Sequence, residues 1–359
     1  MRENKTGTAM LFKSLRSHIK ICSLLDFKSG FHFTCFFQKG IGLSRLITRL
    51  ALLILLFSSQ INASEGGASF LDQGVGAIPR SLGNNYVGAV EGPEGIYWNA
   101  GTLVFNKSEE ISATSYTAFE TQYRSLLMNF RENKNIEAGI GFIGANIDGL
   151  LKTSLNPMIN RYELTGNEFG YSGQGYLGTV STKLTESIGI GLTGKIITET
   201  LDQNHALGFG VDAGILAKIT SNFSAGINIQ NLIQPKMSWD TASKNIDTAT
   251  QAVKLGWEYS PMNNEQNIRI VSDISLTKGD KPSWGIGMEY NLNENLPIRI
   301  GFKSNAQTIT DLKDQIFKFQ NFSFGTGLRL GHWTIDLSWT NPQADYLDTE
   351  TVLSAGYRF

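Results

Sequence analysis

The feature that most constrains the fold of this chain is an alternation of apolar and polar residues with a period of two, dominant from about residue 111 onward. In the segment 187–197, SIGIGLTGKII, isoleucine and leucine alternate with glycine, threonine and lysine, and the segment 207–219, LGFGVDAGILAKI, repeats the pattern. Successive side chains of a strand point to opposite faces, so this period predicts strands with one apolar face. The 38 glycines and 8 prolines also favour an all-β chain over a helical enzyme.

Fourteen segments carry this signature, and most are close to the roughly 9 to 11 residues of a tilted strand that crosses a bilayer. An even number of strands lets a barrel close with antiparallel neighbours throughout, so that no backbone donor is left unpaired against lipid. The sequence therefore predicts a transmembrane antiparallel β-barrel of about 14 strands. The predicted strands are 111–119, 122–131, 136–146, 174–184, 187–199, 205–219, 222–230, 251–259, 267–276, 283–291, 296–303, 320–330, 332–339 and 350–359.

The gaps between the predicted strands sort by length. Alternate gaps are never longer than seven residues, whereas the others include 147–173, 231–250, 304–319 and 340–349. Short turns at one end and long loops at the other are typical of outer-membrane barrels. We therefore expect a location in the bacterial outer membrane, with outer-membrane lipid as a partner.

The chain ends in SAGYRF, where an alternating final strand carries Tyr357 and the terminal Phe359. This ending resembles the signal by which outer-membrane barrels are recognised for insertion. It predicts that Tyr357 and Phe359 form the insertion signal and that the barrel-assembly machinery is a partner.

A compact apolar run near the N-terminus predicts export. The run 50–57, LALLILLF, follows Arg45 and Arg49, and the Ile-Asn-Ala sequence that ends at Ala63 suits a signal-peptidase site. The alternative is a transmembrane helix, but eight residues are far fewer than the roughly 20 that span a bilayer. We expect an extended N-terminus and signal peptide at 1–63, cleaved after Ala63.

Cleavage would change the charge and the cysteine content. Residues 1–63 contain nine of the 31 basic side chains, two of the 32 acidic ones, and both cysteines, Cys22 and Cys35. The exported chain would carry a net charge of about −8, so nucleic acid is excluded as a partner. It would also form no disulfide and use no thiolate chemistry.

No pattern in the exported chain indicates catalysis. A Gly-x-Gly-x-x-Gly spacing at 189–194 lies inside an alternating stretch, whereas a dinucleotide site needs it between a strand and a helix. His205 and His332 are far apart and have no cysteine nearby, which predicts no metal site. We expect a non-enzymatic protein with no catalytic residues and no cofactor.

The polar faces of the predicted strands would line the lumen of the barrel. Charges of both signs occur there in similar numbers, which favours a mutually paired network over a selective ion pore. A barrel of this size is wider than its own side chains fill, and the many inward glycines leave room for other backbone. We expect the segment 64–110 to form a plug inside the barrel of 111–359. The expected lumen charges are Lys195, Asp212, Lys218, Lys254, Glu258, Arg269, Asp273, Glu289, Arg299, Lys303, Arg329 and Asp336.

The predicted plug contains SLGNNYVGAVEGPEGIYWNAGTL at 81–103, with turn-forming glycines around a Tyr-Trp-Asn sequence. This resembles the PorV/PorQ family and the wider group similar to FadL fatty-acid transporters, in which RALGMGGA and IYWNPAGL segments precede a fourteen-stranded barrel. The chain departs from that pattern in GNNYVGA and in Ala100, which replaces the family's proline. The resemblance implies that Asn99 anchors the plug and that Arg80, Tyr97 and Trp98 contact the plug, a ligand or a partner.

The resemblance implies two functions. One is protein export or surface attachment of cargo, as in a type IX secretion system, with secreted cargo proteins as partners. The alternative is a FadL-like passage for hydrophobic small molecules. A purely structural barrel is a third possibility.

The 147–173 loop bears on this choice because it is unusually apolar for a loop that faces water. We expect its residues Leu155, Met158, Tyr162 and Phe169 to contact a partner. The alternative is that the loop folds inward over the lumen.

Overall fold

The computed structural model describes residues 66–89, 91–242, 245–261, 267–341 and 349–359. The predicted signal peptide and its cleavage after Ala63 lie outside the described residues. One sixteen-stranded antiparallel sheet dominates the described part of the chain, and pairing between β5 and β6 closes fourteen of its strands into a barrel. The predicted fold class is confirmed.

Each barrel strand pairs with its neighbour along the chain, except that β7 pairs with β10 across an inserted hairpin and β1 pairs with β16. The strand bounds are β1 Glu110–Ala118, β2 Thr121–Asn133, β3 Ile136–Asn156, β4 Arg161–Thr185, β5 Ile188–Leu201, β6 Asn204–Thr220, β7 Phe223–Ile233, β10 Ala252–Tyr259, β11 Ile268–Thr277, β12 Ser283–Asn293, β13 Leu296–Ser304, β14 Phe322–Leu330, β15 Trp333–Thr340 and β16 Glu350–Arg358. All fourteen predicted strands are present.

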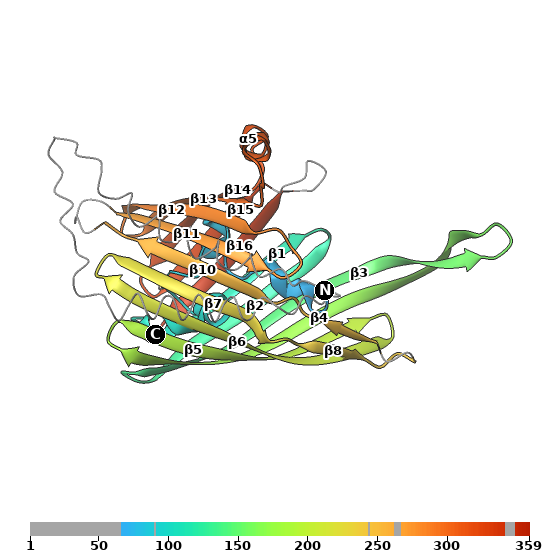
Figure 1. The fold of residues 1–359 in the computed structure, drawn as a ribbon, viewed down its shortest axis with the longest axis horizontal. Coiled ribbons are helices and arrows are strands. Elements are labelled where there is room, and N and C mark those ends of the chain that lie inside the picture. The colour runs from blue at the N-terminus through green and yellow to red at the C-terminus, as the bar shows by residue number, and fades with distance from the viewer. Residues whose placement is uncertain (1–65, 90, 243–244, 262–266, 342–348) are drawn as a thin grey trace, which may run out of the picture. The chain divides into compact units, whose positions relative to one another are not determined.

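Three of the expected long loops contain secondary structure that the alternation did not indicate. β3 and β4 continue through most of 147–173 as a two-stranded arm that projects beyond the barrel (Figure 1, green). The 231–250 segment forms the hairpin of β8 (Lys236–Trp239) and β9 (Ile246–Thr248), and the 304–319 segment forms helix α5 (Ile309–Phe317). The expectation that 147–173 is a loop, whether open or folded over the lumen, was wrong because backbone pairing continues beyond the apolar band.

The two faces of the barrel differ as the alternation predicts. Large apolar side chains such as Ile140, Leu192 and Phe209 are exposed on the outer face, while their chain neighbours face inward and are buried or half-buried. Apolar side chains facing out and polar side chains facing in are the arrangement of a barrel surrounded by lipid.

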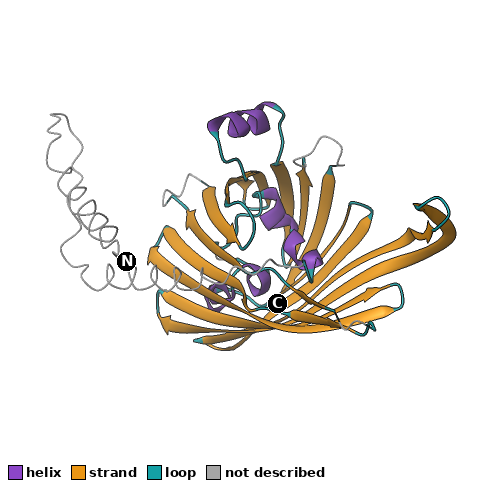
Figure 2. Ribbon diagram, turned by 45° about the vertical axis from the view of Figure 1, so that its right-hand side comes forward, coloured by secondary structure: helices purple, strands orange, loops and turns teal. Residues whose placement is uncertain are grey.

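The segment before β1 lies inside the ring of strands (Figure 2). Its short helices are η2 (Ser69–Gln73), α3 (Ala77–Ser81), α4 (Gly95–Trp98) and η3 (Ala100–Phe105). Almost every residue from Gly74 to Val104 that is described is buried. No helix in the described part of the chain is long and apolar enough to cross a membrane.

Candidate functional site in the plugged lumen

The plug, defined as the described residues of 66–106, fits against the wall at inward-facing glycines. A Cβ atom on Gly191 would meet the backbone of Ala100, and one on Gly214 would meet Asn99. Gly226 meets Val87 in the same way. Glycine is required at these positions because backbone approaches the wall more closely than a side chain allows.

Asn99 connects two parts of the plug to the barrel. Its Nδ2 donates to the carbonyl oxygen of Val87 at 2.7 Å and to that of Ile215 on β6 at 3.0 Å. Its Oδ1 accepts from the Gly101 N–H at 3.0 Å and so caps η3. Asn99 is fully buried. These are the contacts that a plug-anchoring side chain would make, although anchoring itself stays a prediction.

Tyr97 and Trp98 use their polar atoms within the plug. The Tyr97 hydroxyl donates to the carbonyl oxygen of Leu71, and Trp98 Nε1 donates to that of Val75 at 3.0 Å. The two rings meet edge to face with centroids 5.1 Å apart. They hold the beginning of the plug to its end. A contact of Tyr97 or Trp98 with a ligand or partner stays a prediction.

Arg80 connects α3 to the wall. Its Nη1 lies 2.5 Å from Glu350 Oε2 on β16, and its Nη2 donates to the Tyr116 hydroxyl on β1 at 2.7 Å. All three side chains are buried. Arg80 therefore spans the seam where the first and last strands of the barrel meet.

The charged residues of the lumen are largely paired with one another. Lys195 lies 2.7 Å from Asp212, and Arg299 lies 2.5 Å from Glu289 and 2.7 Å from Asp336. This agrees with the expected paired network. Such pairs stabilise a wall in which a lone buried charge would be costly.

Glu91 of the plug lies among three arginines, an arrangement that the sequence pattern does not predict. Its carboxylate lies 2.6 Å from Arg269, 3.6 Å from Arg329 and 3.7 Å from Arg358. Burial alone would raise the pKa of Glu91, but the arginines hold it at about 2. The one available signal was that Glu91 and Glu94 are the sole acidic residues of 73–106.

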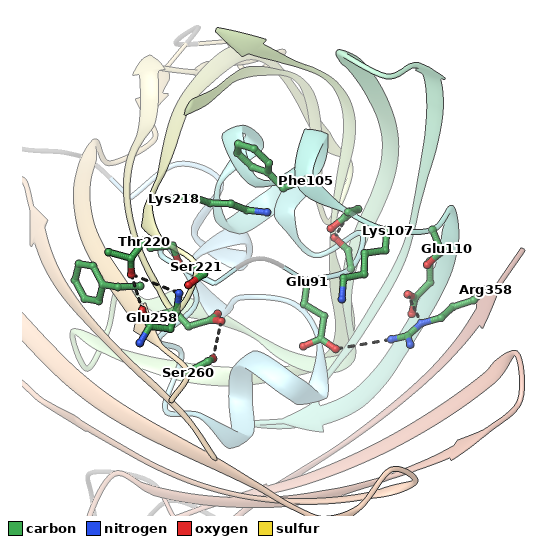
Figure 3. A pocket seen from close by; sticks show the side chains of 16 residues that line it. Glu91, Phe105, Lys107, Glu110, Lys218, Thr220, Ser221, Glu258, Ser260 and Arg358 are labelled. Carbon is green, nitrogen blue, oxygen red and sulfur yellow. Dashed lines mark hydrogen bonds and ion pairs between the residues drawn. The ribbon is translucent and has the colours of Figure 1, made fainter. Parts of the chain in front are cut away.

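Glu91 lines a cavity of about 580 Å³ at the end of the barrel that carries the short turns. We call it the turn-end cavity, and Figure 3 shows the Glu91 carboxylate facing Arg358 within it. On the opposite side, the Lys218 ammonium lies 4.3 Å from the centroid of the Phe105 ring. The cavity is therefore lined partly by plug residues and partly by charged residues at the ends of strands.

Glu94, a plug residue outside the strands, is in the opposite electrostatic state from Glu91. Burial, together with the nearby Glu110 carboxylate, raises the pKa of Glu94 to about 8. Its Oε1 accepts a hydrogen bond from Ser112 Oγ at 2.8 Å. The docked plug thus favours a neutral Glu94 near neutral pH.

A second cavity, of about 800 Å³, opens at the end of the barrel that carries the long connections. Asp72 from the plug and Lys254 and Lys303 from the wall line it. The plug segment that contains Asn99 does not line this cavity, and neither does Glu91. We call it the loop-end cavity.

The outer-loop residues fall into two places. Leu155 and Tyr162 are opposite each other near the tip of the β3–β4 arm, and Met158 in its turn is 91% exposed. Phe169 lies nearer the barrel, opposite Leu150, and is half-buried. The structure brings the first three together and leaves Phe169 apart from them.

The chain terminus forms an aromatic cluster. The Tyr357 ring lies 4.8 Å from Trp333 and 5.2 Å from Phe359, centroid to centroid. Phe359 is exposed. A role for these residues in insertion stays a prediction.

In the described residues, no group of three or more His, Cys, Asp or Glu side chains is placed to hold a metal ion.

Comparisons with known proteins find the fold but no close relative. No protein-family model matches the chain, and no curated protein matches it. The Ralstonia pickettii toluene transporter TbuX superposes with a TM-score of 0.57 at 12% identity, covering 80% of this chain and 98% of that one. The Pseudomonas putida toluene transporter TodX gives 0.54 at 13% identity over 79% and 98% of the two chains.

A Pseudomonas aeruginosa FadL homologue gives a TM-score of 0.51 at 10% identity, over 79% of this chain and 98% of that one. These similarities concern the FadL-type group and add nothing to the PorV/PorQ resemblance. At such low identity they establish the fold alone: this chain is a closed antiparallel barrel of fourteen strands, similar in fold to these FadL-like structures.

Proposed function

We propose that this chain is a non-enzymatic channel of the bacterial outer membrane, in which the plug controls the passage of small molecules. The observation that carries the proposal is the position of the plug between two cavities, one at each end of a closed barrel. A molecule that entered at one end would meet plug residues before reaching the other. The transporters that share the fold support a small-molecule cargo, and those named for toluene support the hydrophobic class.

A disulfide that locks the plug to the wall would test this proposal. The Ser181 hydroxyl on β4 lies 3.3 Å from the backbone nitrogen of Val104 in η3, so a disulfide between cysteines at these two positions would join the plug to the wall. Because both natural cysteines precede the predicted cleavage site, the Val104→Cys/Ser181→Cys pair would be the sole thiols of the exported chain.

We expect that vesicles containing the oxidised double variant take up toluene and small neutral solutes several-fold more slowly than the same vesicles after reduction. Each single-cysteine variant is the control, because it should not respond to reductant. Equal uptake before and after reduction, with the disulfide verified by mass spectrometry, would contradict a role for plug movement.

A second candidate function rests on the arm. One face of the arm tip carries Leu155, Tyr162 and Leu164, while Glu163 and Arg161 point to the other face with Asn156 and Ser154. An exposed apolar face on a projecting hairpin is suited to binding another protein. This supports the export or cargo-attachment function, with a secreted protein as partner.

The triple replacement of Leu155, Tyr162 and Leu164 by serine tests this candidate, since it removes the apolar face but retains the arm. Crosslinking on intact cells should then lose a partner that the parent protein captures. The control variant replaces Ser154, Asn156 and Glu163 on the polar face by alanine. Capture of the same protein by both variants would exclude the apolar face as the docking surface.

A further inference from the structure

The lining of the loop-end cavity is polar. Among its fifteen lining residues, the single apolar side chain is Ala252. Ser275, Ser283 and Thr277 add hydroxyl groups from β11 and β12. A hydrocarbon gains free energy mainly by burying apolar surface, and most of the surface of this cavity is polar. The ligand chemistry that the loop-end cavity suits is therefore hydrophilic.

Two lysines from separate strands of the wall line this cavity. Lys254 on β10 is opposite Ser275 on β11, and Lys303 on β13 is opposite Gly285 on β12. The two strands are three strand spacings apart, roughly 14 Å between backbones. Lysine side chains are long enough for both ammonium groups to reach one small molecule held between them.

Neither ammonium group is neutralised by a close carboxylate. The ion pairs of the described residues include Lys195, Arg269 and Arg299, but not Lys254 or Lys303. Asp273 is the barrel carboxylate near both lysines, and its Oδ2 already accepts the plug N–H groups of Tyr86 at 2.8 Å and Val87 at 3.0 Å. These lysines thus differ from the paired charges deeper in the lumen.

Two aromatic rings of the plug lie beneath Lys254. Its ammonium lies 5.2 Å from the centroid of Trp98 and 5.9 Å from that of Tyr97, so the plug supplies a cation–π platform beneath it. Asp72 of the plug and Asp280 also line the cavity, and the negative charge of Asp72 acts on Lys254. Both aspartates are exposed to solvent, and neither makes an ion pair among the described residues. A half-buried lysine that lacks a carboxylate partner is best stabilised by an anion from solution.

We propose that the loop-end cavity binds a small hydrophilic organic anion, with its carboxylate or phosphate groups held between Lys254 and Lys303. This rests on the proposed channel function but departs from the hydrophobic cargo that the toluene transporters support, because it assigns anion selectivity to the loop-end cavity. The surrounding serine and threonine hydroxyls supply neutral hydrogen-bond donors to the same ligand. Toluene and other hydrocarbons gain little at this cavity.

Isothermal titration of the detergent-purified protein with succinate and with inorganic phosphate tests the proposal. Lys254→Met and Lys303→Met remove one charge each while retaining most of the side-chain volume. Each should weaken binding by about tenfold or more, the effect of losing one charge-assisted contact. The matched control is Lys313→Met on α5, an exposed lysine outside the cavity. The uncharged analogue succinamide should not bind.

Retention of the barrel in each variant is verified by its faster migration on gels without boiling. The proposal is overturned if the parent protein binds neither anion, or if both cavity variants bind as tightly as Lys313→Met. Uptake of neutral solutes by the reduced Val104→Cys/Ser181→Cys protein is measured separately. That uptake with no anion binding would reject the anion site and leave the channel, whereas anion binding with no uptake would reject the channel alone.

Discussion

At the scale of single residues, the two plug glutamates show how one segment holds opposite charge states a few residues apart. Glu91 is stabilised as an anion by Arg269, Arg329 and Arg358, while Glu94 meets a hydroxyl group and another carboxylate. The plug is therefore tied to the wall by one fixed charge and by one group that responds to pH. Neither role depends on the Trp98-Asn99 pair that dominates the sequence pattern.

The raised pKa of Glu94 gives a pH dependence to plug docking. The pKa of Glu94 is about 8 while the plug is docked and near its usual 4.5 once the plug is released. Glu94 therefore stabilises the docked plug fully below pH 4.5, and this contribution is lost as the pH rises through 8. Arg80 is the sole basic residue of 66–106, so tryptic cleavage there reports release. We expect faster cleavage at pH 9 than at pH 6.

The Glu94→Gln variant provides the control for this prediction, because its neutral amide does not titrate and the pH response of trypsin itself is shared. Cleavage of the variant should show only that shared response. If the parent and Glu94→Gln proteins show the same ratio of rates at the two pH values, Glu94 does not control docking.

At the scale of elements, β5 combines two surfaces with different requirements. Its inward Gly191 lies against Ala100 of η3, whereas a Cβ atom added to Gly194 on the outer side would meet only the Gly178 carbonyl oxygen, at 3.8 Å. A strand glycine is thus a docking feature at one position and a weak strand former at the other.

Gly191→Ala should displace the plug, because the new methyl group would overlap backbone atoms of Ala100 that cannot move independently of η3. We expect a cost of about 1–3 kcal/mol in plug docking, measured as faster tryptic cleavage after Arg80. Gly194→Ala on the same strand should leave the rate unchanged. Equal rates for the two variants would contradict the observed fit of η3 against β5.

At the scale of the whole molecule, the barrel depends on an apolar outer band that lipid must cover. Leu192 is 56% exposed on that band, and Leu155 is 49% exposed on the arm beyond it. The two leucines have similar exposure, but Leu192 lies on the band that lipid covers and Leu155 lies outside it.

Leu192→Arg should lower the free energy of unfolding in lipid vesicles by about 2–4 kcal/mol, the cost of an arginine facing lipid near the bilayer midplane. Urea titration followed by tryptophan fluorescence measures the change. Leu155→Arg should have an effect below about 0.5 kcal/mol because the arm tip faces water. Similar losses for the two variants would place the arm in the membrane or the band outside it.

The sequence by itself determined the strands and the class of fold. Alternation is a local property, since each residue's side of the strand is set by its immediate neighbours. That is why segments such as 187–199 and 283–291 agree with β5 and β12 within two residues. The same alternation separated the lipid-facing residues from those of the lumen.

Only the tertiary structure decided what meets inside the barrel. Arg80 and Glu350 are 270 positions apart, and Glu91 meets arginines from β11, β14 and β16. The arm was missed because its pairing continues through residues whose apolar pattern is broken by bulges near Leu150 and Leu151. Contacts between distant segments depend on closure of the ring and on the path of the plug, and no periodicity within a strand encodes either of these.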